Sequence, residues 1–179
     1  MPEPWIEFPH VWETKAKFFT WVRGGLREAV WNQHPIKREY IKHKRVRVPL
    51  GKITKSNPEA LIWGGQCEQC LTLLKQSDCE VDHNIPSGSL NDVEDIAGFT
   101  QRLLMISFDN LSIVCKPCHK IKSYADRMKI TFEEAKVAKK FIAFRKLSKL
   151  DKLEELGYTP SHKATHEALN TEWKSKQDN

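Results

Sequence analysis

The sequence predicts an α+β fold in which a small cysteine-framed core lies between helical extensions. Two cysteine pairs with a two-residue gap enclose the central part of the chain, at 67–70 and 115–118. Between them, the residues around Asp82-His83 and the run at 111–114 are typical of short strands. The segments on both sides instead repeat apolar residues at helical spacing. These three observations together favour a mixed fold over an all-helical one.

The four paired cysteines are interpreted as one structural zinc site. A gap of two residues lets neighbouring thiolates reach the same tetrahedral ion, and a second pair completes a four-thiolate set. Two disulfides or a chance spacing are the alternatives, and a reducing compartment would favour zinc. The proposed ligands are Cys67, Cys70, Cys115 and Cys118. For the fifth cysteine, Cys79, we expect a small buried side chain and assign no role.

Residues able to support hydrolytic chemistry lie next to this frame. Asp82-His83 falls inside the loop that the zinc would close, and His119 directly follows the fourth cysteine. A closed zinc site does no chemistry itself, but it holds the two ends of the segment together. His119 is thereby expected to lie near Asp82-His83, where a carboxylate and imidazoles suit a divalent metal and a general base. The alternative for His119 is to replace one cysteine as a zinc ligand.

Asp82-His83, then Asn110, then His119 inside a frame of two CxxC pairs resembles the HNH nucleases, which have the ββα-metal fold. The resemblance covers about residues 61–127. It implies that His83 is the general base that activates water, and that Asp82 and His119 bind the catalytic metal. It also implies that Asn110 holds the backbone of the hairpin, and Asp-Asn is good turn chemistry in any case.

The resemblance implies a metal-dependent DNA endonuclease, a hydrolase that leaves 5′-phosphate and 3′-hydroxyl ends by nicking or by double-strand cleavage. The implied fold is a zinc-stabilised HNH core with helical N- and C-terminal extensions. Mg²⁺, Mn²⁺ or Ni²⁺ is the expected catalytic ion, since one carboxylate and one imidazole suit all three. The layout is similar to freestanding phage-encoded HNH endonucleases, which implies the cytoplasm of the host. One departure is a longer segment after His83, in which 93–105 predicts an inserted helix.

Local geometry restricts how these side chains meet. Consecutive side chains of a regular strand point to opposite faces, so Asp82 and His83 cannot both face one site unless the strand ends or bends there. Asn84-Ile85-Pro86 follows directly, and the proline favours a bend. On a helix, Cys118 and His119 project about 100° apart, so one can face the zinc while the other faces the active site.

Charge is unevenly distributed along the chain. The net charge is +6 over residues 1–60, −4 over 61–126 and +4 over 127–179. Basic flanks beside an acidic core suit an enzyme that acts on nucleic acid, because the flanks bind phosphates and the carboxylates bind cations. We therefore predict three domains: a helical and basic N-terminal module at 1–60 that contacts DNA, a nuclease core at 61–128, and a helical extension at 129–179.

Contacts with DNA are expected from the basic run at 37–55 and from the helix that carries His119. A solvated charged face is the alternative interpretation of such a run. Contacts of this kind bind the phosphate backbone and do not select a base sequence. The expected contact residues are Lys42, Lys44, Arg45, Arg47, Lys120, Lys122 and Arg127. No apolar stretch reaches the length that spans a bilayer, so DNA and no membrane is expected as the partner, with a monomer as the acting form.

Further elements are predicted towards the two ends of the chain. Residues 1–10 are expected to form an extended arm, and residues 11–31 a helical segment that Gly24-Gly25 interrupts. Alternation of Val46 and Val48 with basic residues favours a strand or extended arm within 37–55. Helices are expected at 119–128, at 132–147 after a Thr131–Glu134 capping box, at 148–156 before Gly157, and loosely within 161–179.

Two other classes of function stay open. A catalytically inactive, zinc-framed module would keep the cysteines and the basic flanks, and would bind DNA or RNA without cleaving it under any metal. An RNA-directed nuclease or nuclease-derived regulator would use the aromatic side chains of the N-terminal module as stacking surfaces for bases. It would prefer RNA or single strands to duplex DNA.

Overall fold

A computed structural model describes residues 2–159 and 161–177. The chain forms two compact units, Met1–His119 and Lys120–Asn179. Helices occur together with small sheets and with a cluster of four cysteines, so the predicted α+β class is confirmed. The predicted division of the chain at 60/61 and 128/129 stays a prediction.

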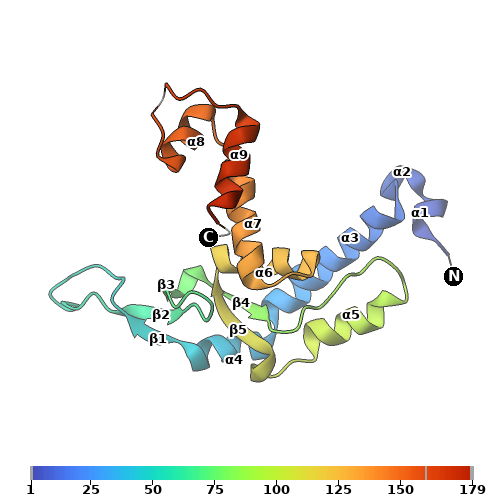
Figure 1. Ribbon diagram of the computed structural model, residues 1–179. Helices are drawn as coiled ribbons and strands as arrows, with labels where there is room; N and C mark the ends of the chain where they lie inside the picture. The colour runs from blue at the N-terminus through green and yellow to red at the C-terminus, as the bar shows by residue number, and fades with distance from the viewer. Residues whose placement is uncertain (1, 160, 178–179) are drawn as a thin grey trace. The chain divides into compact units, whose positions relative to one another are not determined.

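The first unit begins with a run of helical turns (Figure 1). These are α1 (Pro4–Glu7), α2 (Pro9–Trp12), α3 (Lys15–Gly25), the π-helix η1 (Leu26–Val30), the 3-10 turn η2 (Trp31–Gln33) and α4 (Pro35–Lys44). The expected extended arm over residues 1–10 is therefore wrong. A proline begins both α1 and α2, where its fixed φ favours a helical turn and its missing N–H is not needed.

The glycine pair changes the type of helix without interrupting the run. At the start of α3, the hydroxyl of Thr14 accepts a hydrogen bond from the amide of Lys17 at 3.2 Å. The helix ends at Gly25, and η1 follows at once with one more residue per turn than an α-helix. The helical run is thus not broken at Gly24-Gly25. It changes from an α-helix to a π-helix directly after Gly25.

A three-stranded antiparallel sheet follows α4, in the order β1-β2-β3. Its strands are β1 (Val46–Val48), β2 (Ile62–Gln66) and β3 (Leu73–Lys75). The expected strand or extended arm within 37–55 is correct only for β1, because residues up to Lys44 belong to α4. Pro35 begins that helix, and the Lys, Arg and Glu residues after it have good helix propensity, which a charge run by itself does not reveal.

Strand β2 approaches its two neighbours closely at Gly64. A Cβ atom built on Gly64 would lie 2.1 Å from the carbonyl oxygen of Leu74 and 2.5 Å from Cγ2 of Val48. Both neighbours are buried, so they have little room to move. Only a residue without a side chain fits at this point of the sheet.

A β-hairpin and a helix carry the predicted site. The strands β4 (Cys79–His83) and β5 (Leu111–Cys115) pair antiparallel, from Cys79 opposite Cys115 to His83 opposite Leu111. The 3-10 turn η3 (Gln76–Asp78) precedes β4, and α5 (Asp95–Leu104) and the 3-10 turn η4 (Phe108–Asn110) lie in the connection. Helix α6 (Lys116–Met128) starts directly after β5. The strand at 111–114 and the helices within 93–105 and 119–128 are confirmed.

The core of the first unit combines side chains from helices and strands. Phe99 and Leu103 of α5 are almost fully buried, so the inserted helix is part of the core. Tyr40 of α4 is buried as well, and its hydroxyl donates a hydrogen bond to the carbonyl of Leu111 at 2.8 Å. The other large buried apolar side chains described in this unit are Phe19, Trp31, Val48, Leu74, Val81, Leu90, Leu111, Ile113 and Val114.

The described part of the second unit contains, after α6, the helices α7 (Phe132–Arg145), α8 (Lys149–Leu156) and α9 (His166–Ser175). The predicted capping box begins α7, and Gly157 ends α8 with a φ of 83°. The core of this unit consists of Phe144, Leu153, Leu156, Leu169 and Trp173. Among the helices of residues 2–159 and 161–177, none has both the length and the apolar character needed to cross a membrane.

Replacing Gly64 with alanine is expected to lower the free energy of unfolding by about 1–3 kcal/mol, because the new methyl group must push the strands apart. Thermal unfolding followed by circular dichroism measures the change. Gly24→Ala is the matched control, because nothing outside its own helix lies within 4 Å of a Cβ built there. A Gly64→Ala protein as stable as the parent would contradict the close approach.

Candidate active site

Strand β4 presents two carboxylates on one face. Glu80 and Asp82 are two residues apart, and side chains at that spacing share a face of a strand. The side chain of Asp82 is 19% exposed and that of Glu80 is 34% exposed. His83 comes one residue later, belongs to the opposite face and is buried. Asp82 and His83 therefore have different surroundings, as strand alternation predicts.

His119 on α6 faces both carboxylates with its two ring nitrogens. Its Nδ1 lies 2.5 Å from Oε2 of Glu80, and its Nε2 lies 3.6 Å from Oδ1 of Asp82. The structure thus brings together Asp82 and His119, the two predicted ligands of a catalytic metal. When Nδ1 donates its proton to Glu80, Nε2 keeps the lone pair that a metal would bind, beside Asp82.

Glu80 is a site residue that the sequence analysis missed. Its contact with Nδ1 sets both the tautomer and the orientation of the His119 ring, as carboxylates commonly do for metal-binding histidines. A signal was present, because Glu80 precedes Asp82 by the spacing that puts two side chains on one face of a strand.

His83 is held from two sides. Its Nε2 lies 3.0 Å from the carbonyl oxygen of Leu103, and its ring packs on the indole of Trp31 with 4.1 Å between the ring centroids. Because a carbonyl only accepts hydrogen bonds, Nε2 carries the proton and Nδ1 is the basic nitrogen of the neutral ring. A histidine in one defined tautomer is suited to act as a general base. Trp31 and Leu103 were not predicted, since they are distant from His83 in sequence.

Asn110 closes the turn that leads into β5. Its Oδ1 accepts hydrogen bonds from the backbone amide and the hydroxyl of Ser107, at 2.9 and 3.1 Å. Its own carbonyl accepts a hydrogen bond from the amide of Asn84, the residue after His83, at 2.6 Å. Asn110 therefore ties together the two strands of the hairpin at the end where His83 lies.

Lys37 on α4 lies near the carboxylate of Glu80. Its Nζ is 4.8 Å from the ring centroid of Trp31 and donates a hydrogen bond to Asn32 at 3.3 Å. Partial burial lowers the pKa of Lys37, and the negative charge of Glu80 opposes that shift. Lys37 thus adds a positive charge close to the acidic face of β4.

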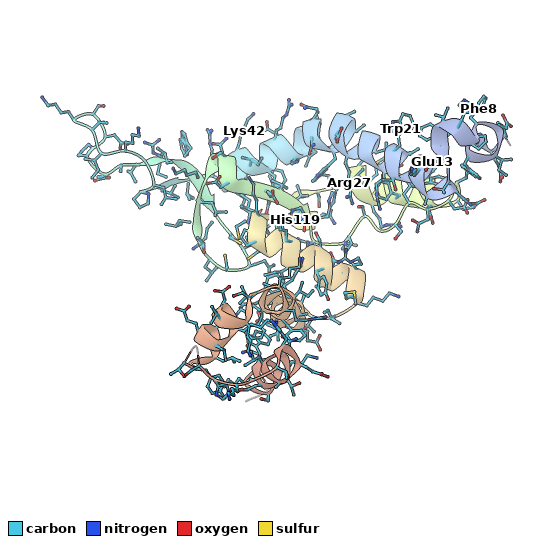
Figure 2. The ribbon with its side chains drawn as sticks, turned by 90° about the horizontal axis from the view of Figure 1, so that it is seen from above. Phe8, Glu13, Trp21, Arg27, Lys42 and His119 are labelled. Atoms are coloured by element: carbon cyan, nitrogen blue, oxygen red, sulfur yellow. The ribbon has the colours of Figure 1, made fainter. Side chains whose placement is uncertain are left out.

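Arg27 in η1 has a similar relation to Asp82. Protein atoms around its guanidinium lower the pKa of Arg27, the charge of Arg23 lowers it further, and the charge of Asp82 opposes both effects. Arg27 is labelled in Figure 2 on the N-terminal helical run, together with His119 on α6. Neither Arg27 nor Lys37 was among the predicted site residues, because their approach to β4 depends on how the N-terminal helices pack.

The four cysteines predicted as zinc ligands come together. Their Sγ atoms all lie within 4.8 Å of one another, and those of Cys70 and Cys115 are 3.9 Å apart. A zinc ion holds thiolates at about 2.3 Å in a tetrahedron, whose corners are then about 3.8 Å apart. Cys67, Cys115 and Cys118 are buried, and Cys70 is exposed. This cysteine cluster could hold a metal ion such as zinc.

Hydrogen bonds and burial act in opposite directions on these thiols. Hydrogen bonds with Thr72 lower the pKa of Cys70 to about 6, whereas burial raises the pKa of Cys115 and of Cys118. The backbone amides of Cys115 and Cys118 donate to the sulfurs of Cys67 and Cys115, each at 3.4 Å. A form of the cluster with four thiolates therefore depends on a bound cation to offset their burial and mutual repulsion.

Cys79 and His119 stay outside the cysteine cluster. Cys79 is half-buried and not buried as expected. Its Sγ lies 3.4 Å from the carbonyl oxygen of Lys75, and partial burial raises the pKa of this thiol. The ring of His119 is engaged with Glu80 and Asp82. All five cysteines are free thiols, so neither the disulfide alternative nor a histidine in the cluster is seen.

The residues predicted to contact DNA lie in both units. Lys42 and Lys44 end α4, with their amines 2.6 Å from Glu39 and 3.5 Å from Glu68. Arg45 and Arg47 lie next to and within β1. The remaining three, Lys120, Lys122 and Arg127, belong to α6 in the second unit. Contact of these residues with DNA stays a prediction.

Cys118→Ser is expected to remove bound zinc and to lower the free energy of unfolding by more than about 3 kcal/mol, because an incomplete site no longer joins the segments it links. Zinc content by mass spectrometry and thermal unfolding measure the two effects. Cys79→Ser is the matched control and is expected to keep both the zinc and the melting temperature of the parent. Normal zinc content and an unchanged melting temperature in Cys118→Ser would refute the zinc assignment.

No protein-family model, no curated protein and no solved structure matches the chain. The arrangement of Glu80, Asp82, His83 and His119 beside the cysteine cluster is therefore what supports a functional assignment.

Proposed function

We propose that the protein is a metal-dependent DNA endonuclease of the HNH type, which hydrolyses phosphodiester bonds. The observation that carries this proposal is the approach of Asp82 on β4 to His119 on α6, with 3.6 Å between Oδ1 and Nε2. This pair lies on a strand–strand–helix segment that also holds a histidine in one tautomer, His83. A carboxylate oxygen and an imidazole nitrogen at this separation suit two ligands of one divalent ion.

The donor set fits Mg²⁺, Mn²⁺ or Ni²⁺. Asp82 offers a hard oxygen and His119 an imidazole nitrogen, and two protein ligands leave room for water and substrate. Glu80 holds the His119 ring so that Nε2 is available beside Asp82. When bound there, such an ion supplies positive charge that stabilises the charge developing on the phosphate oxygens.

His83 is the proposed general base. With the Nε2 proton directed at the carbonyl of Leu103, Nδ1 is the nitrogen that would take a proton from the attacking water. His83 belongs to the face of β4 opposite Asp82, but it is the last residue of the strand, so the water would have to reach both side chains around this end of β4. The indole of Trp31 packs against the ring and restricts its rotation. The water oxygen attacks phosphorus in line with the 3′-oxygen, the bond between phosphorus and that oxygen breaks, and the 3′-oxygen takes a proton from solvent. The products are a 5′-phosphate and a 3′-hydroxyl, as the resemblance implies.

Arg27 and Lys37 are the proposed phosphate-binding cations. Among the residues that the structure describes, neither has a carboxylate within ion-pair distance. The negative charge of Asp82 nevertheless acts on Arg27, and that of Glu80 acts on Lys37. Lys37 is half-buried and Arg27 is exposed, and a cation without an ion pair is stabilised by an incoming anion, more so where it is partly desolvated. These charges also offset the repulsion that Glu80 and Asp82 would exert on a phosphodiester.

The cysteine cluster is proposed to bind structural zinc. Four thiolates fill all four positions of a tetrahedral ion, so none is left for water or substrate. The cluster instead joins Cys67 and Cys70, after β2, to Cys115 at the end of β5 and Cys118 in the first turn of α6. It thereby holds the first turn of α6, in which Cys118 lies one residue before His119.

On this proposal the protein acts on the DNA backbone as a monomer, in the manner of freestanding phage-encoded HNH endonucleases, and in the cytoplasm of a host. A single site per chain nicks one strand at a time. The basic residues predicted from the sequence would add contacts with phosphates and would make binding depend strongly on salt.

Substitution of His83 with alanine is expected to reduce metal-dependent nicking of a supercoiled plasmid by roughly 10²–10⁴-fold, because the general base is lost. The assay compares Mg²⁺, Mn²⁺ and Ni²⁺, and the exposed His10→Ala serves as the matched control. Cleavage by His83→Ala at the parental rate would remove His83 from the chemistry. A parent protein that shifts the plasmid on a gel but cleaves it under no metal would instead favour the inactive zinc-framed binding module.

Glu80→Gln tests the orientation of His119. Glutamine keeps an oxygen near Nδ1 but removes the negative charge, so the Mn²⁺ concentration for half-maximal nicking is expected to rise about 10–100-fold. The rate at saturating Mn²⁺ should change less, since Asp82 and His83 are intact. Glu7→Gln on exposed α1 controls for the loss of a charge. An unaltered Mn²⁺ requirement would show that Glu80 does not position a metal ligand.

A further inference from the structure

A paired arginine surface lies on the hairpin of β1 and β2, in a part of the first unit that the proposed chemistry does not use. The guanidinium carbons of Arg45 and Arg47 lie 4.3 Å and 5.2 Å from the ring centroid of Trp63. Arg47 stands directly opposite Trp63 in the pairing of the two strands. Trp63 is 45% exposed, so an indole and two guanidinium groups together form one exposed platform. We call these three residues the Arg–Trp–Arg platform.

The segment around the platform carries positive charge only. Between residues 41 and 58 there are six Lys or Arg residues and no Asp or Glu. Lys42 and Lys44 are paired with Glu39 and Glu68. Among the described residues, no carboxylate lies within ion-pair distance of Arg45 or Arg47. Within the part of the chain that the structure describes, Arg45 and Arg47 therefore bring charge without a counter-ion to an exposed aromatic ring.

The connection between β1 and β2, residues 49–61, is held by its own hydrogen bonds. The amide of Gly51 donates to the carbonyl of Ala60 at 2.6 Å. The side chain of Asn57 bonds both the amide and the carbonyl of Leu61, at 2.9 and 3.0 Å. Figure 1 shows this connection as the loop that extends beyond β1 and β2. These hydrogen bonds hold together the hairpin that carries the platform.

We infer that the Arg–Trp–Arg platform is a separate binding surface for the sugar–phosphate backbone of duplex DNA. The inference rests on the proposed function in taking DNA as the partner, and it adds a contact surface apart from Asp82, His83 and His119. Guanidinium groups bind phosphate through two parallel N–H donors, and an aromatic surface beneath them limits their motion before binding. Trp63, to which the sequence analysis gave no role, is the residue that positions the two arginines.

The geometry favours phosphate over base stacking. Both guanidinium groups lie over the indole ring, where a stacked base would have to displace them. Arg47 uses one donor for the carbonyl of Leu61 at 3.2 Å, which leaves further donors on the same group for phosphate. A surface of this kind supplies affinity without selecting a base sequence. If bases stacked on Trp63 instead, we would expect the protein to prefer single strands or RNA to duplex DNA.

The test is equilibrium binding of the full chain to a labelled DNA duplex, followed by fluorescence anisotropy over a range of salt concentrations with no chelator and no added Mg²⁺, Mn²⁺ or Ni²⁺, so that metal in the cysteine cluster is kept. Arg45→Ala combined with Arg47→Ala is expected to reduce the slope of log K against log salt by about 2, because two phosphate contacts are lost. Trp63→Leu is expected to weaken binding about fivefold with a slope close to the parent's, since the charges remain but must be ordered on binding.

Two further variants keep this test decisive. Trp63→Phe retains an aromatic face and should restore most of the affinity lost in Trp63→Leu. Trp21→Leu changes an exposed tryptophan of α3 (Figure 2) and should bind duplex as the parent does. Melting temperatures of all variants confirm that each is folded.

Parental affinity in Trp63→Leu, a parental salt slope in the arginine double variant, or stronger competition by single-stranded DNA or RNA than by duplex would each overturn the inference. Because binding is measured without added Mg²⁺, Mn²⁺ or Ni²⁺, the result is independent of cleavage. Loss of duplex binding in the platform variants of a protein that never cleaves would support the platform while rejecting the nuclease.

Discussion

The cysteine cluster is the constraint on which the rest of the first unit depends. Its Sγ atoms lie within 4.8 Å of one another, although they come from the ends of β2 and β5 and the start of α6. Cys118 and His119 are neighbours on a helix and so point about 100° apart. With Cys118 directed at the cluster, His119 is turned towards β4, where Glu80 and Asp82 lie. A cysteine cluster that could hold a metal ion thus determines the direction of a side chain outside it.

Charges of both signs act around His119. Glu80 and Asp82 lie next to its ring, and their negative charges act on Lys37 and Arg27 of the N-terminal helices. The acidic pair suits a cation, and the basic pair suits the anion that would follow it. From the sequence, only an acidic middle segment and a basic N-terminal flank can be seen, because net charge along a chain does not reveal which residues meet.

Structural features that depend on residues close together in the chain were predicted correctly from the sequence. The cysteine spacing, the capping box at Thr131 and the glycine stop at Gly157 each depend on near neighbours and match the structure. Closing the cysteine frame was also enough to predict that His119 meets Asp82. Trp31 and Leu103 could not be predicted, since their contacts with His83 depend on how η2 and α5 pack. The helices at residues 4–12 were missed because a proline can begin a helix as readily as an extended segment.

The π-helix η1 has a consequence for insertions and deletions. It holds one residue more per turn than an α-helix, and each residue added to a helix rotates everything after it by about 100°. Arg27 lies within η1, and Trp31 and Lys37 follow it, all three near β4. A one-residue deletion that restored α-helical winding in η1 would leave the residues after it on nearly the same face, because the wider turn absorbs one residue. A deletion at unchanged winding would turn Trp31 and Lys37 by about 100°, with both side chains still present. In this stretch the length of the chain is therefore as much a part of the candidate site as the identity of its residues.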